Sequence, residues 1–422
     1  MHSVTNAIPT GTIASIPAKA HAHRALICAA LANSPSTILL SRTSKDIDAT
    51  MESLRGLGAH VVYENKVVTV TPGPVPAKGN VVPHESGTTL RLLLPVAASI
   101  CNDVDVDAKG RLPDRPLEPM LGEMKAHGVT FSQDKPPFTM TGRLQGGNFS
   151  MVGDVSSQFF SGLLLAAPQI GLSTITSTTP LQSSDYVTLT TKTMRDFGVE
   201  VEHTLPDTNI NEAFTVPFGA SFIGRDNYQI EGDWSNAAIW MVAAGMTGKP
   251  ITITGMNKNS VQADRRIMQV MIDAGCDVVW DGMNITVTGR ASKPIHADLE
   301  QMPDMLPVMA ALACSISGES SFVKGARLRL KESDRLVAVA NLVRDLGGTV
   351  REEGDDLYII GSGILKGGHG DCVNDHRLVM AGTLMALISE NPVTLQDSEA
   401  ITKSYPDFFE DWNLLGGDAH GI

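Results

Sequence analysis

The hydrophobic and polar positions of this chain follow one pattern that recurs six times. Each time, an apolar helix-like run rich in small residues is followed by a short polar turn and a strand-like run. The runs start at Arg24, Arg91, Ser157, Asn236, Asp304 and His376. The recurrence predicts a repeated α/β unit of about 70 residues.

A second kind of helix recurs between the apolar ones. It ends at a glycine and precedes an alternating strand, as in "MESLRGLGAHVVYE" and "NLVRDLGGTVREE". The glycine fits a left-handed C-cap, and the alternation fits a half-buried strand. The first helix of each unit is apolar or small on all sides and should be buried, whereas the second is amphipathic and should face solvent.

The length of the repeat indicates the architecture. A period near 70 residues is longer than that of solenoid repeats, so the pattern predicts compact α/β lobes of three units each. We expect the break between lobes near "FIGRDNYQI", because the preceding "HTLPDTNINEAFTVPFGASF" lacks helical periodicity. The pattern leaves open whether the N-terminal strand stays with the first lobe.

Composition and charge narrow the class of protein. The chain has 422 residues, is 42% hydrophobic and carries a net charge of −13, which argues against a general surface for nucleic acids or anionic membranes. Its five cysteines form no CxxC pair and fit a reducing compartment. The start lacks the apolar core of a signal peptide, and no apolar run reaches membrane-spanning length, so we expect a cytoplasmic protein.

One basic stretch stands out in this acidic chain. "IPAKAHAHR", residues 16–24, contains a lysine, an arginine and no acid, and an apolar helical run follows it. Cations at a helix start oppose the helix dipole, a cost that makes sense if an anion binds there. A solvated loop is the alternative interpretation.

Other repeats also place unusual residues at the start of the apolar helix. These are Gly87 and Arg91 in "ESGTTLR", the hydroxyls and amide of "DVSSQ", Asp304 in "QMPDM" and Arg377 in "NDHR". Helix starts from one repeated unit would converge if each lobe has internal threefold symmetry, and together with arginines they form a strong anion site. Taken singly, each could be a helix cap or a surface charge.

The densest charge cluster is "LRLKESDRL", residues 328–336. On a helix, Lys331 and Arg335 would share one face with like charge, as in a solvated helix face. In the functional interpretation, both cations bind an anion and Glu332 transfers a proton. Arg115 in "DRP" and Lys403 in "ITKSYPDFF" add two further cations, and the histidines show no metal-ligand spacing.

Four motifs in this order, "SSQF", "KESDRL", "NDHR" and "KSYPDFF", resemble the enolpyruvyl transferase family, in its shikimate branch, across nearly the whole chain. The resemblance implies a two-lobed inside-out α/β barrel of six βαβαββ repeats, three per lobe. It assigns residues 15–225 to the first lobe and residues 1–14 and 226–422 to the second, with hinges near 12–16 and 224–228.

The resemblance also implies a reaction. The family transfers the enolpyruvyl group of phosphoenolpyruvate to the 5-hydroxyl of shikimate 3-phosphate, without a metal or an organic cofactor. We therefore expect a monomer whose partners are these two small molecules, and neither nucleic acid nor membrane. One alternative acts on UDP-N-acetylglucosamine, although the cysteine acid typical of that loop is missing from "GRLPDRPLE". The other is a non-catalytic relative that senses anions.

Site residues follow from the resemblance by position. Asp304 would accept the hydroxyl proton, and Lys19 or Glu332 would protonate the methylene carbon. The residues expected to bind shikimate 3-phosphate are Lys19, Ala20, Arg24, Ser156, Ser157, Gln158, Ser183, Tyr186, Asp304, Arg327 and Lys331. Those expected around phosphoenolpyruvate are Lys19, Gly87, Arg115, Gln158, Arg335, Arg377 and Lys403.

The chain departs from the family pattern at several of these positions. Ala18 and Ala20 stand where the family has serines, and Arg327 stands where asparagine is usual. Glu85 and Leu92 likewise replace a usual asparagine and proline. Loss of the second serine weakens a contact to the shikimate carboxylate, at a cost of about 1.5–3 kcal/mol. These alanines are the best support for a weak or non-catalytic relative.

Overall fold

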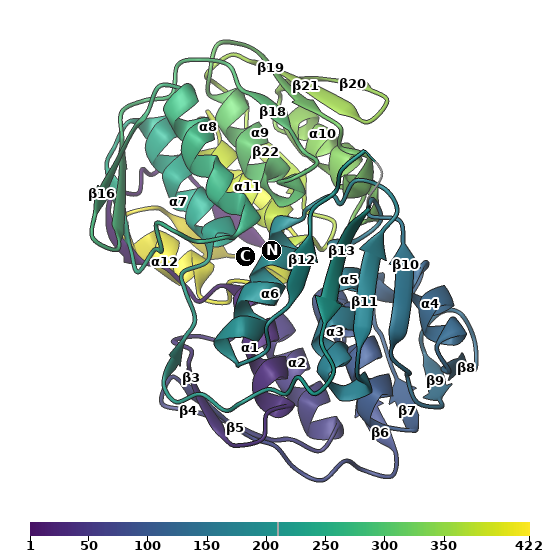
Figure 1. Cartoon of the computed structure of the whole chain (residues 1–422). Coiled ribbons are helices and arrows are strands. Elements are labelled where there is room, and N and C mark those ends of the chain that lie inside the picture. Colours follow the sequence, from purple (N-terminus) through teal and green to yellow (C-terminus); the bar gives the residue numbers. More distant parts are fainter. Residues whose placement is uncertain (209–210) are drawn as a thin grey trace. The chain divides into compact units, whose positions relative to one another are not determined.

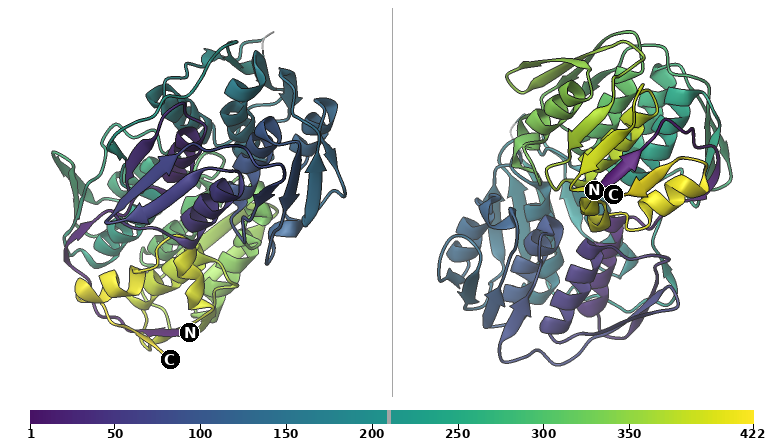
Figure 2. Two further views of the ribbon diagram at one scale, coloured as in Figure 1. Left: turned by 90° about the horizontal axis from the view of Figure 1, so that it is seen from below. Right: turned by 180° about the vertical axis from the view of Figure 1, so that it is seen from behind.

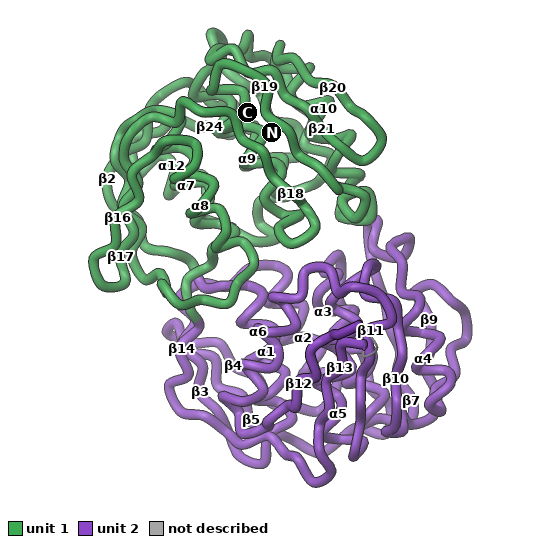
Figure 3. Tube along the Cα trace, turned by 45° about the horizontal axis from the view of Figure 1, so that its top comes forward, with its two compact units in different colours: residues 1–16, 231–422 green, residues 17–230 purple. Residues whose placement is uncertain are grey.

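The computed structural model describes residues 1–208 and 211–422. The chain divides into two compact units, which are described separately (Figure 3). Unit 1 contains residues 1–16 and 231–422, and unit 2 contains residues 17–230.

Among the described residues there are six four-stranded sheets, and all six share one order of strand pairing. In the second repeat of unit 2, β6 and β7 pair in parallel around α3, and the chain returns through α4 to β8 and β9. Strand β9 pairs antiparallel with both β7 and β8. This is the βαβαββ order, and the bounds are β6 (Gly79–Val81), α3 (Gly87–Ile100), β7 (Asp103–Val106), α4 (Met120–Ala126), β8 (Thr130–Phe131) and β9 (Phe138–Thr141).

The other elements of unit 2 are α1 (Lys19–Ala30), β3 (Ser36–Leu39), α2 (Lys45–Gly56), β4 (His60–Glu64), β5 (Val67–Thr71), η1 (Leu112–Asp114), β10 (Gly147–Met151), α5 (Ser157–Ile170), β11 (Ser173–Ser177), α6 (Asp185–Asp196), β12 (Glu202–Thr204), β13 (Glu212–Val216) and β14 (Tyr228–Gln229).

Unit 1 contains β1 (His2–Val4), β2 (Gly11–Ala14), α7 (Trp234–Thr247), β15 (Ile251–Thr254), η2 (Ala263–Arg266), α8 (Ile267–Asp273), β16 (Asp277–Asp281), β17 (Asn284–Thr288), β18 (His296–Asp298), η3 (Pro303–Met305), α9 (Leu306–Cys314), β19 (Gly318–Val323), η4 (Ala326–Leu330), α10 (Arg335–Asp345), β20 (Thr349–Glu353), β21 (Asp356–Gly361), β22 (Gly368–Asp371), α11 (His376–Ala386), β23 (Val393–Gln396), η5 (Ser398–Lys403), α12 (Phe408–Leu414) and β24 (Ala419–Gly421).

Strands distant in sequence complete several sheets. In unit 2, β14 pairs in parallel with β3 and supplies the first strand of the first repeat. In unit 1, β2 pairs in parallel with β15, and β1 lies between β23 and β24. The two chain ends therefore lie side by side, and the backbone N–H of Ile422 donates to the carbonyl of Met1 at 3.2 Å (Figure 2).

The first helix of each repeat is buried along nearly its whole length, which confirms the prediction from its all-round apolar composition. In unit 2, α3 packs against α5, and the strands lie outside these helices (Figure 1). Each unit has its own hydrophobic core, built around these helices. The apolar helices are thus the interior of each unit, and their N-terminal ends carry the polar residues of interest.

The glycines predicted to end the second helices adopt the expected conformation. Gly58, Gly128, Gly198, Gly275 and Gly347 have φ angles between +86° and +103°. A side chain is strained in this region, so glycine ends each helix and turns the chain into the next strand.

The solvated-helix alternative for residues 328–336 is wrong. Lys331 and Arg335 do not share a helix face, because η4 ends at Leu330 and α10 begins only at Arg335. Asp334, the N-cap of α10, accepts a hydrogen bond from the backbone N–H of Val337 and so starts the helix later than the charge pattern suggested.

None of the described helices is long and apolar enough to cross a membrane.

Candidate active site

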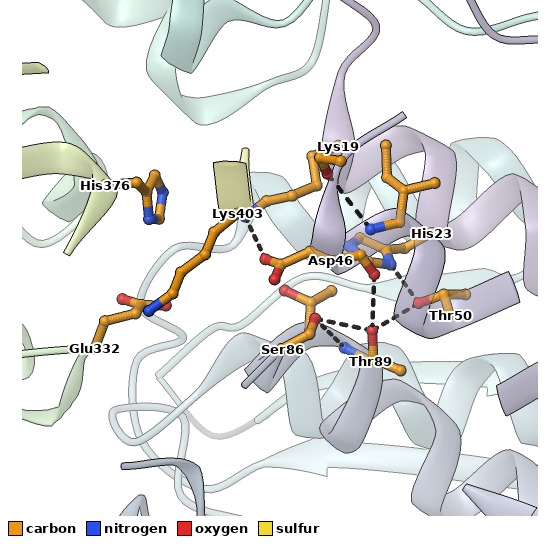
Figure 4. A network of polar contacts seen from close by, with 12 residues as sticks. Lys19, His23, Asp46, Thr50, Ser86, Thr89, Glu332, His376 and Lys403 are labelled. Carbon is orange, nitrogen blue, oxygen red and sulfur yellow. Dashed lines mark hydrogen bonds and ion pairs between the residues drawn. The ribbon is translucent and has the colours of Figure 1, made fainter. Parts of the chain in front are cut away.

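In unit 2, Lys19 is the first residue of α1, and its charge is balanced by an acid from another helix. Ala18 at the N-cap makes no side-chain bond, and the first turn holds no acidic residue. Asp46, in the first turn of α2, places its Oδ2 atom 2.7 Å from Lys19 Nζ (Figure 4). The basic stretch 16–24 therefore has a counter-charge that sequence reasoning missed, because an acid in a first helical turn is usual on electrostatic grounds alone.

A chain of hydroxyl groups ties the starts of α1, α2 and α3 together (Figure 4). Thr89 Oγ1 lies 3.3 Å from the carbonyl oxygen of Asp46 and 2.8 Å from Ser86 Oγ. The same atom lies 2.7 Å from Thr50 Oγ1, which is 2.6 Å from His23 Nδ1. These contacts fix the backbone that carries Asp46, and through it the position of Lys19.

His23 is a neutral member of this network. Burial, together with the positive charges of Lys19 and Arg24, holds its pKa well below the ordinary value. Its role here is structural, since its Nδ1 atom bonds a buried threonine.

Arg24 is only 1% exposed and is bonded within unit 2. Burial lowers its pKa to about 10, so it stays charged at neutral pH. Its Nε donates to Thr190 Oγ1 at 2.7 Å, Nη1 to the Ala20 carbonyl at 2.7 Å, and Nη2 to Ser161 Oγ at 3.2 Å and the Tyr186 carbonyl at 3.0 Å. These contacts join α1, α5 and α6 and leave one N–H of Nη1 for another acceptor.

At the start of α3, Gly87 lies against the guanidinium of Arg115. A Cβ at residue 87 would collide with that guanidinium. The structure thus brings these two predicted residues together, and it does so because residue 87 has no side chain.

The start of α5 is linked to α3 through Gln158. Its Oε1 accepts from Arg91 Nη1 at 3.1 Å, and its Nε2 donates to Thr88 Oγ1 at 2.9 Å. Ser156 is the N-cap and accepts from the backbone N–H of Gln158 at 3.3 Å. Arg91 was expected at the anion site but not as a substrate ligand, and Thr88 was not singled out; both orient Gln158, which was expected to bind substrate.

The other polar residues predicted in unit 2 lie at the starts of α5 and α6. Ser157 and Ser183 are buried, and Tyr186 is half-buried in the first turn of α6. Ser183 has a φ of +54°, which is uncommon for a serine and indicates that its surroundings hold it in place.

In unit 1, four predicted residues form one ionic cluster. Asp304 Oδ1 lies 3.1 Å from Lys331 Nζ and 2.6 Å from Arg335 Nη1. Arg335 Nη2 lies 2.7 Å from Glu332 Oε2. The cluster forms because η3 and the segment between η4 and α10 bring residues 304 and 331–335 together.

The cluster sets the charge of its members. Burial acts to raise the pKa of Asp304, but the cations Lys331, Arg335 and Arg377 outweigh it and hold the pKa well below its usual range. Burial lowers the pKa of Lys331, and the neighbouring Arg335 and Arg327 act in the same direction. Asp304 is therefore ionised at neutral pH and surrounded by cations.

Asp375, which the sequence reasoning did not single out, connects this cluster to α11. Its Oδ2 lies 2.8 Å from Arg335 Nε and 3.0 Å from Ser333 Oγ, and its Oδ1 accepts from the backbone N–H of Arg377 at 2.9 Å. An acid before a helix is usually an N-cap, and Asp375 is one, so its second role has no distinct sequence signal.

Arg377 and Lys403 lie near the start of α11. Arg377 Nη1 donates to the carbonyl of Ser235 at 3.1 Å, and Lys403 Nζ donates to the carbonyl of Asn374 at 2.8 Å. The predicted residues thus form two groups, one in each unit. Among the described residues, no group of three or more His, Cys, Asp or Glu side chains is arranged to hold a metal ion.

Comparison with known proteins gives consistent matches along the whole chain. A sequence model described as EPSP synthase (3-phosphoshikimate 1-carboxyvinyltransferase) matches residues 7–412. The chain is 36% identical over 413 residues to the 3-phosphoshikimate 1-carboxyvinyltransferase of Clostridium kluyveri, covering 97% of this chain and 95% of that protein. It is 34% identical over 417 residues to the enzyme of the same name from Methanocorpusculum labreanum, covering 97% of each.

A solved structure of EPSP synthase from Acinetobacter baumannii matches with a TM-score of 0.82 at 22% identity, covering 100% of this chain and 99% of that chain. This likeness shows the fold, and it confirms the two-lobed inside-out α/β architecture that the family resemblance implied.

Proposed function

Because the chain belongs to the EPSP synthase (3-phosphoshikimate 1-carboxyvinyltransferase) family, we propose that it transfers the enolpyruvyl group of phosphoenolpyruvate to the 5-hydroxyl of shikimate 3-phosphate and releases inorganic phosphate. The observation that carries the proposal is the ionic cluster of Asp304, Lys331, Glu332 and Arg335. It combines cations for anionic substrates with carboxyl groups for proton transfer.

The reaction needs three proton transfers, and the negative charge of both substrates must stay neutralised throughout. A proton adds to the methylene carbon C3 of phosphoenolpyruvate, the 5-hydroxyl oxygen bonds to C2, and the hydroxyl proton passes to a base. Loss of a proton from the new methyl group and of phosphate from C2 then restores the double bond. Fixed cations around two substrates that are both anions supply binding and orientation without reorganisation.

Asp304 is the proposed base for the 5-hydroxyl. Its cationic neighbours keep it ionised before substrate binds. All three of these neighbours, Lys331, Arg335 and Arg377, are proposed to bind substrate anions. Anion binding then weakens their pull on Asp304 and raises its pKa, which makes it a better base once the substrates are in place.

The proposed acids for C3 are Lys19 and Glu332. Asp46 holds the ammonium group of Lys19, and Arg335 holds the carboxyl group of Glu332. Each is therefore held in place by a charged partner, and Glu332 can donate only after its carboxylate, which is paired with Arg335, has taken up a proton.

The remaining residues are proposed to hold the substrates. For shikimate 3-phosphate these are Lys19, Ala20, Arg24, Ser156, Ser157, Gln158, Ser183, Tyr186, Asp304, Arg327 and Lys331, and for phosphoenolpyruvate they are Lys19, Gly87, Arg115, Gln158, Arg335, Arg377 and Lys403. Arg24 offers its free Nη1 N–H to the shikimate carboxylate, and Ala20 offers only its backbone there. Arg327 adds positive charge near Lys331, as its effect on that lysine's pKa indicates.

The proposal requires residues of both units to act on the same substrates. We propose that the two lobes, residues 17–230 and residues 1–16 with 231–422, move about hinges near 12–16 and 224–228 and close when shikimate 3-phosphate binds. Small-angle scattering should show a smaller radius of gyration with this ligand. An unchanged radius would contradict closure.

We further propose that the protein acts as a monomer in the cytoplasm. Its five cysteines are free and buried, which fits a reducing compartment. Light scattering coupled to gel filtration should give the mass of one chain, and a larger mass would contradict the monomer.

The function is tested by measuring phosphate release with both substrates. We expect release only when both are present, and a loss of about 10²–10⁴-fold in kcat for Asp304→Asn. Asp298→Asn, which removes an exposed acid paired with Lys324, is the matched control and should keep full activity. Release with UDP-N-acetylglucosamine in place of shikimate 3-phosphate would favour the other transferase, and binding of both ligands without release would favour a non-catalytic relative.

A further inference from the structure

Unit 1 contains a buried acid that the proposed reaction does not use. Asp264, in η2, is only 1% exposed. Its Oδ2 atom accepts a hydrogen bond from the hydroxyl of Ser235, at the start of α7. Its Oδ1 atom is also buried and has no hydrogen-bond partner among the described residues. A buried carboxylate oxygen without a donor is costly, and the cost falls when the group is protonated.

The charges that face Asp264 also disfavour its ionised form. They are Asp304 on η3, Asp233 at the N-cap of α7 and Arg377 on α11, so two carboxylates oppose one guanidinium. Burial, followed by the charge of Asp304, raises the pKa of Asp264 to about 6, against the opposing effects of Arg377 and the Ser235 hydroxyl.

Ser235 connects this acid to Arg377. Its hydroxyl donates to Asp264, and its carbonyl accepts from Arg377 Nη1 at 3.1 Å. Arg377 Nε is buried and has no hydrogen-bond partner in the described part of the chain, so its guanidinium keeps bonding capacity for a ligand. An anion at Arg377 would neutralise the cation that stabilises the ionised form of Asp264.

We propose that Asp264 takes up a proton when an anion binds to Arg377, and that this coupling makes the strength of anion binding depend on pH. Asp264 acts through Arg377 and touches no reacting atom, so it is a positioning residue. The inference rests on the proposed function, which names phosphoenolpyruvate as the natural anion and shikimate 3-phosphate as the second ligand.

The proposal predicts the direction in which anion binding changes with pH. Above about pH 6 the free protein carries an ionised Asp264, which must regain its proton for the anion to be held at full strength. Anion binding therefore weakens as pH rises, by at most about tenfold per pH unit for one linked proton.

The kinetic test compares wild type with Asp264→Asn, which resembles the protonated side chain and cannot titrate. We expect the ratio of wild-type to variant kcat/KM for phosphoenolpyruvate to fall between pH 6 and 8, by up to about tenfold per unit. Taking the ratio removes the ionisation of phosphoenolpyruvate itself, which both proteins share. A ratio that stays constant would mean that Asp264 has only a structural role and would overturn the inference.

A second test needs no turnover. Inorganic phosphate is titrated calorimetrically at pH 7 into protein saturated with shikimate 3-phosphate, in two non-phosphate buffers of different ionisation enthalpy. An acid with a pKa near 6 is about 90% ionised at pH 7, so wild type should take up more protons per phosphate than Asp264→Asn, by up to about 0.9. Equal uptake would overturn the inference. Absence of phosphate binding to wild type would overturn the anion site itself, a failure distinct from an inactive enzyme that binds phosphate.

Two further variants keep the proposal testable if Asp264→Asn does not fold. Ser235→Ala removes a donor to the carboxylate, so the proton uptake should persist and extend to higher pH. Asp411→Asn replaces another buried acid of unit 1, one bonded to Tyr405, and should leave the uptake unchanged. If Asp264→Asn does not fold, an unshifted profile in Ser235→Ala overturns the proposal.

Discussion

The Nη1 atom of Arg115 lies 2.7 Å from the position that a Cβ would occupy on Gly87. The guanidinium therefore fills the space left by the missing side chain, at the first residue of α3. Free N–H groups at the start of this helix add to the positive potential, so cation and helix start together offer one anion site.

Gly87→Ala should displace Arg115 and weaken the binding of phosphoenolpyruvate. A loss of one charged contact corresponds to about 1.5–3 kcal/mol, which is roughly a 10- to 100-fold rise in KM. Steady-state kinetics measure it. Gly122→Ala is the control, because its added Cβ would meet only the flexible end of Glu118, and its kinetics should be unchanged. An unchanged KM in Gly87→Ala would show that Arg115 does not bind this substrate.

Asp46→Asn should lower kcat, because Lys19 loses the carboxylate that fixes its ammonium group at 2.7 Å. We expect a loss of about tenfold or more if Lys19 transfers a proton. Asp48→Asn removes the other acid from the first turn of α2. It takes the same negative charge away from the helix start, and it should keep kcat. If both variants lose the same activity, the effect belongs to the helix start and not to Lys19.

The fold was largely predictable because one signal was repeated six times. The six apolar helices are located by their hydrophobic residues, and the glycines mark where the amphipathic helices between them end. The pattern holds no information on which distant strand completes a sheet. The parallel pairing of β14 with β3 depends on the closure of unit 2, and the residues of β14 give no local sign of it.

The site was predictable for its cations and much less so for their partners. Lys19, Arg335 and Arg377 stand out because cations near helix starts are unfavourable without an anion. Asp46, Asp264 and Asp375 do not stand out, because each lies where acids are common, in or before a first helical turn. Their roles arise from tertiary contacts with residues far away in the sequence.

Arg24→Lys should destabilise unit 2 as well as weaken substrate binding. The planar guanidinium makes four hydrogen bonds that join α1, α5 and α6, and an ammonium cannot reach all four acceptors. Losing two or three of them costs about 2–4 kcal/mol of unfolding free energy. Hydrogen exchange should show faster exchange in these three helices. Arg195→Lys changes an exposed ion pair with Glu200 and should leave hydrogen exchange unchanged. Equal exchange in the two variants would contradict a structural role for Arg24.

Stability should depend on the charge of Asp264. Its pKa rises on folding from its ordinary 3.8 to about 6, so the folded protein binds this proton more tightly than the unfolded chain. The free energy of unfolding therefore falls as pH rises from about 4 to 6, by at most about 3 kcal/mol, and Asp264→Asn lacks this term. Melting temperatures should shift in favour of the variant across this window. Parallel curves for the two proteins would contradict the raised pKa.

Restoring serine at positions 18 and 20 should have two separable effects. Ala18 is the N-cap of α1 and has an extended backbone but no capping side chain, so Ala18→Ser should raise the melting temperature by capping the helix, a gain of about 1 kcal/mol. Ala20 lies inside the helix and is half-buried, so a serine there adds a hydroxyl for substrate and caps nothing. Ala20→Ser should lower KM for shikimate 3-phosphate by about tenfold. Each variant is the control for the other, since one changes stability alone and the other changes KM alone. If Ala20→Ser leaves KM unchanged, the missing hydroxyl does not limit substrate binding, and the departure at position 20 no longer argues for a weak enzyme.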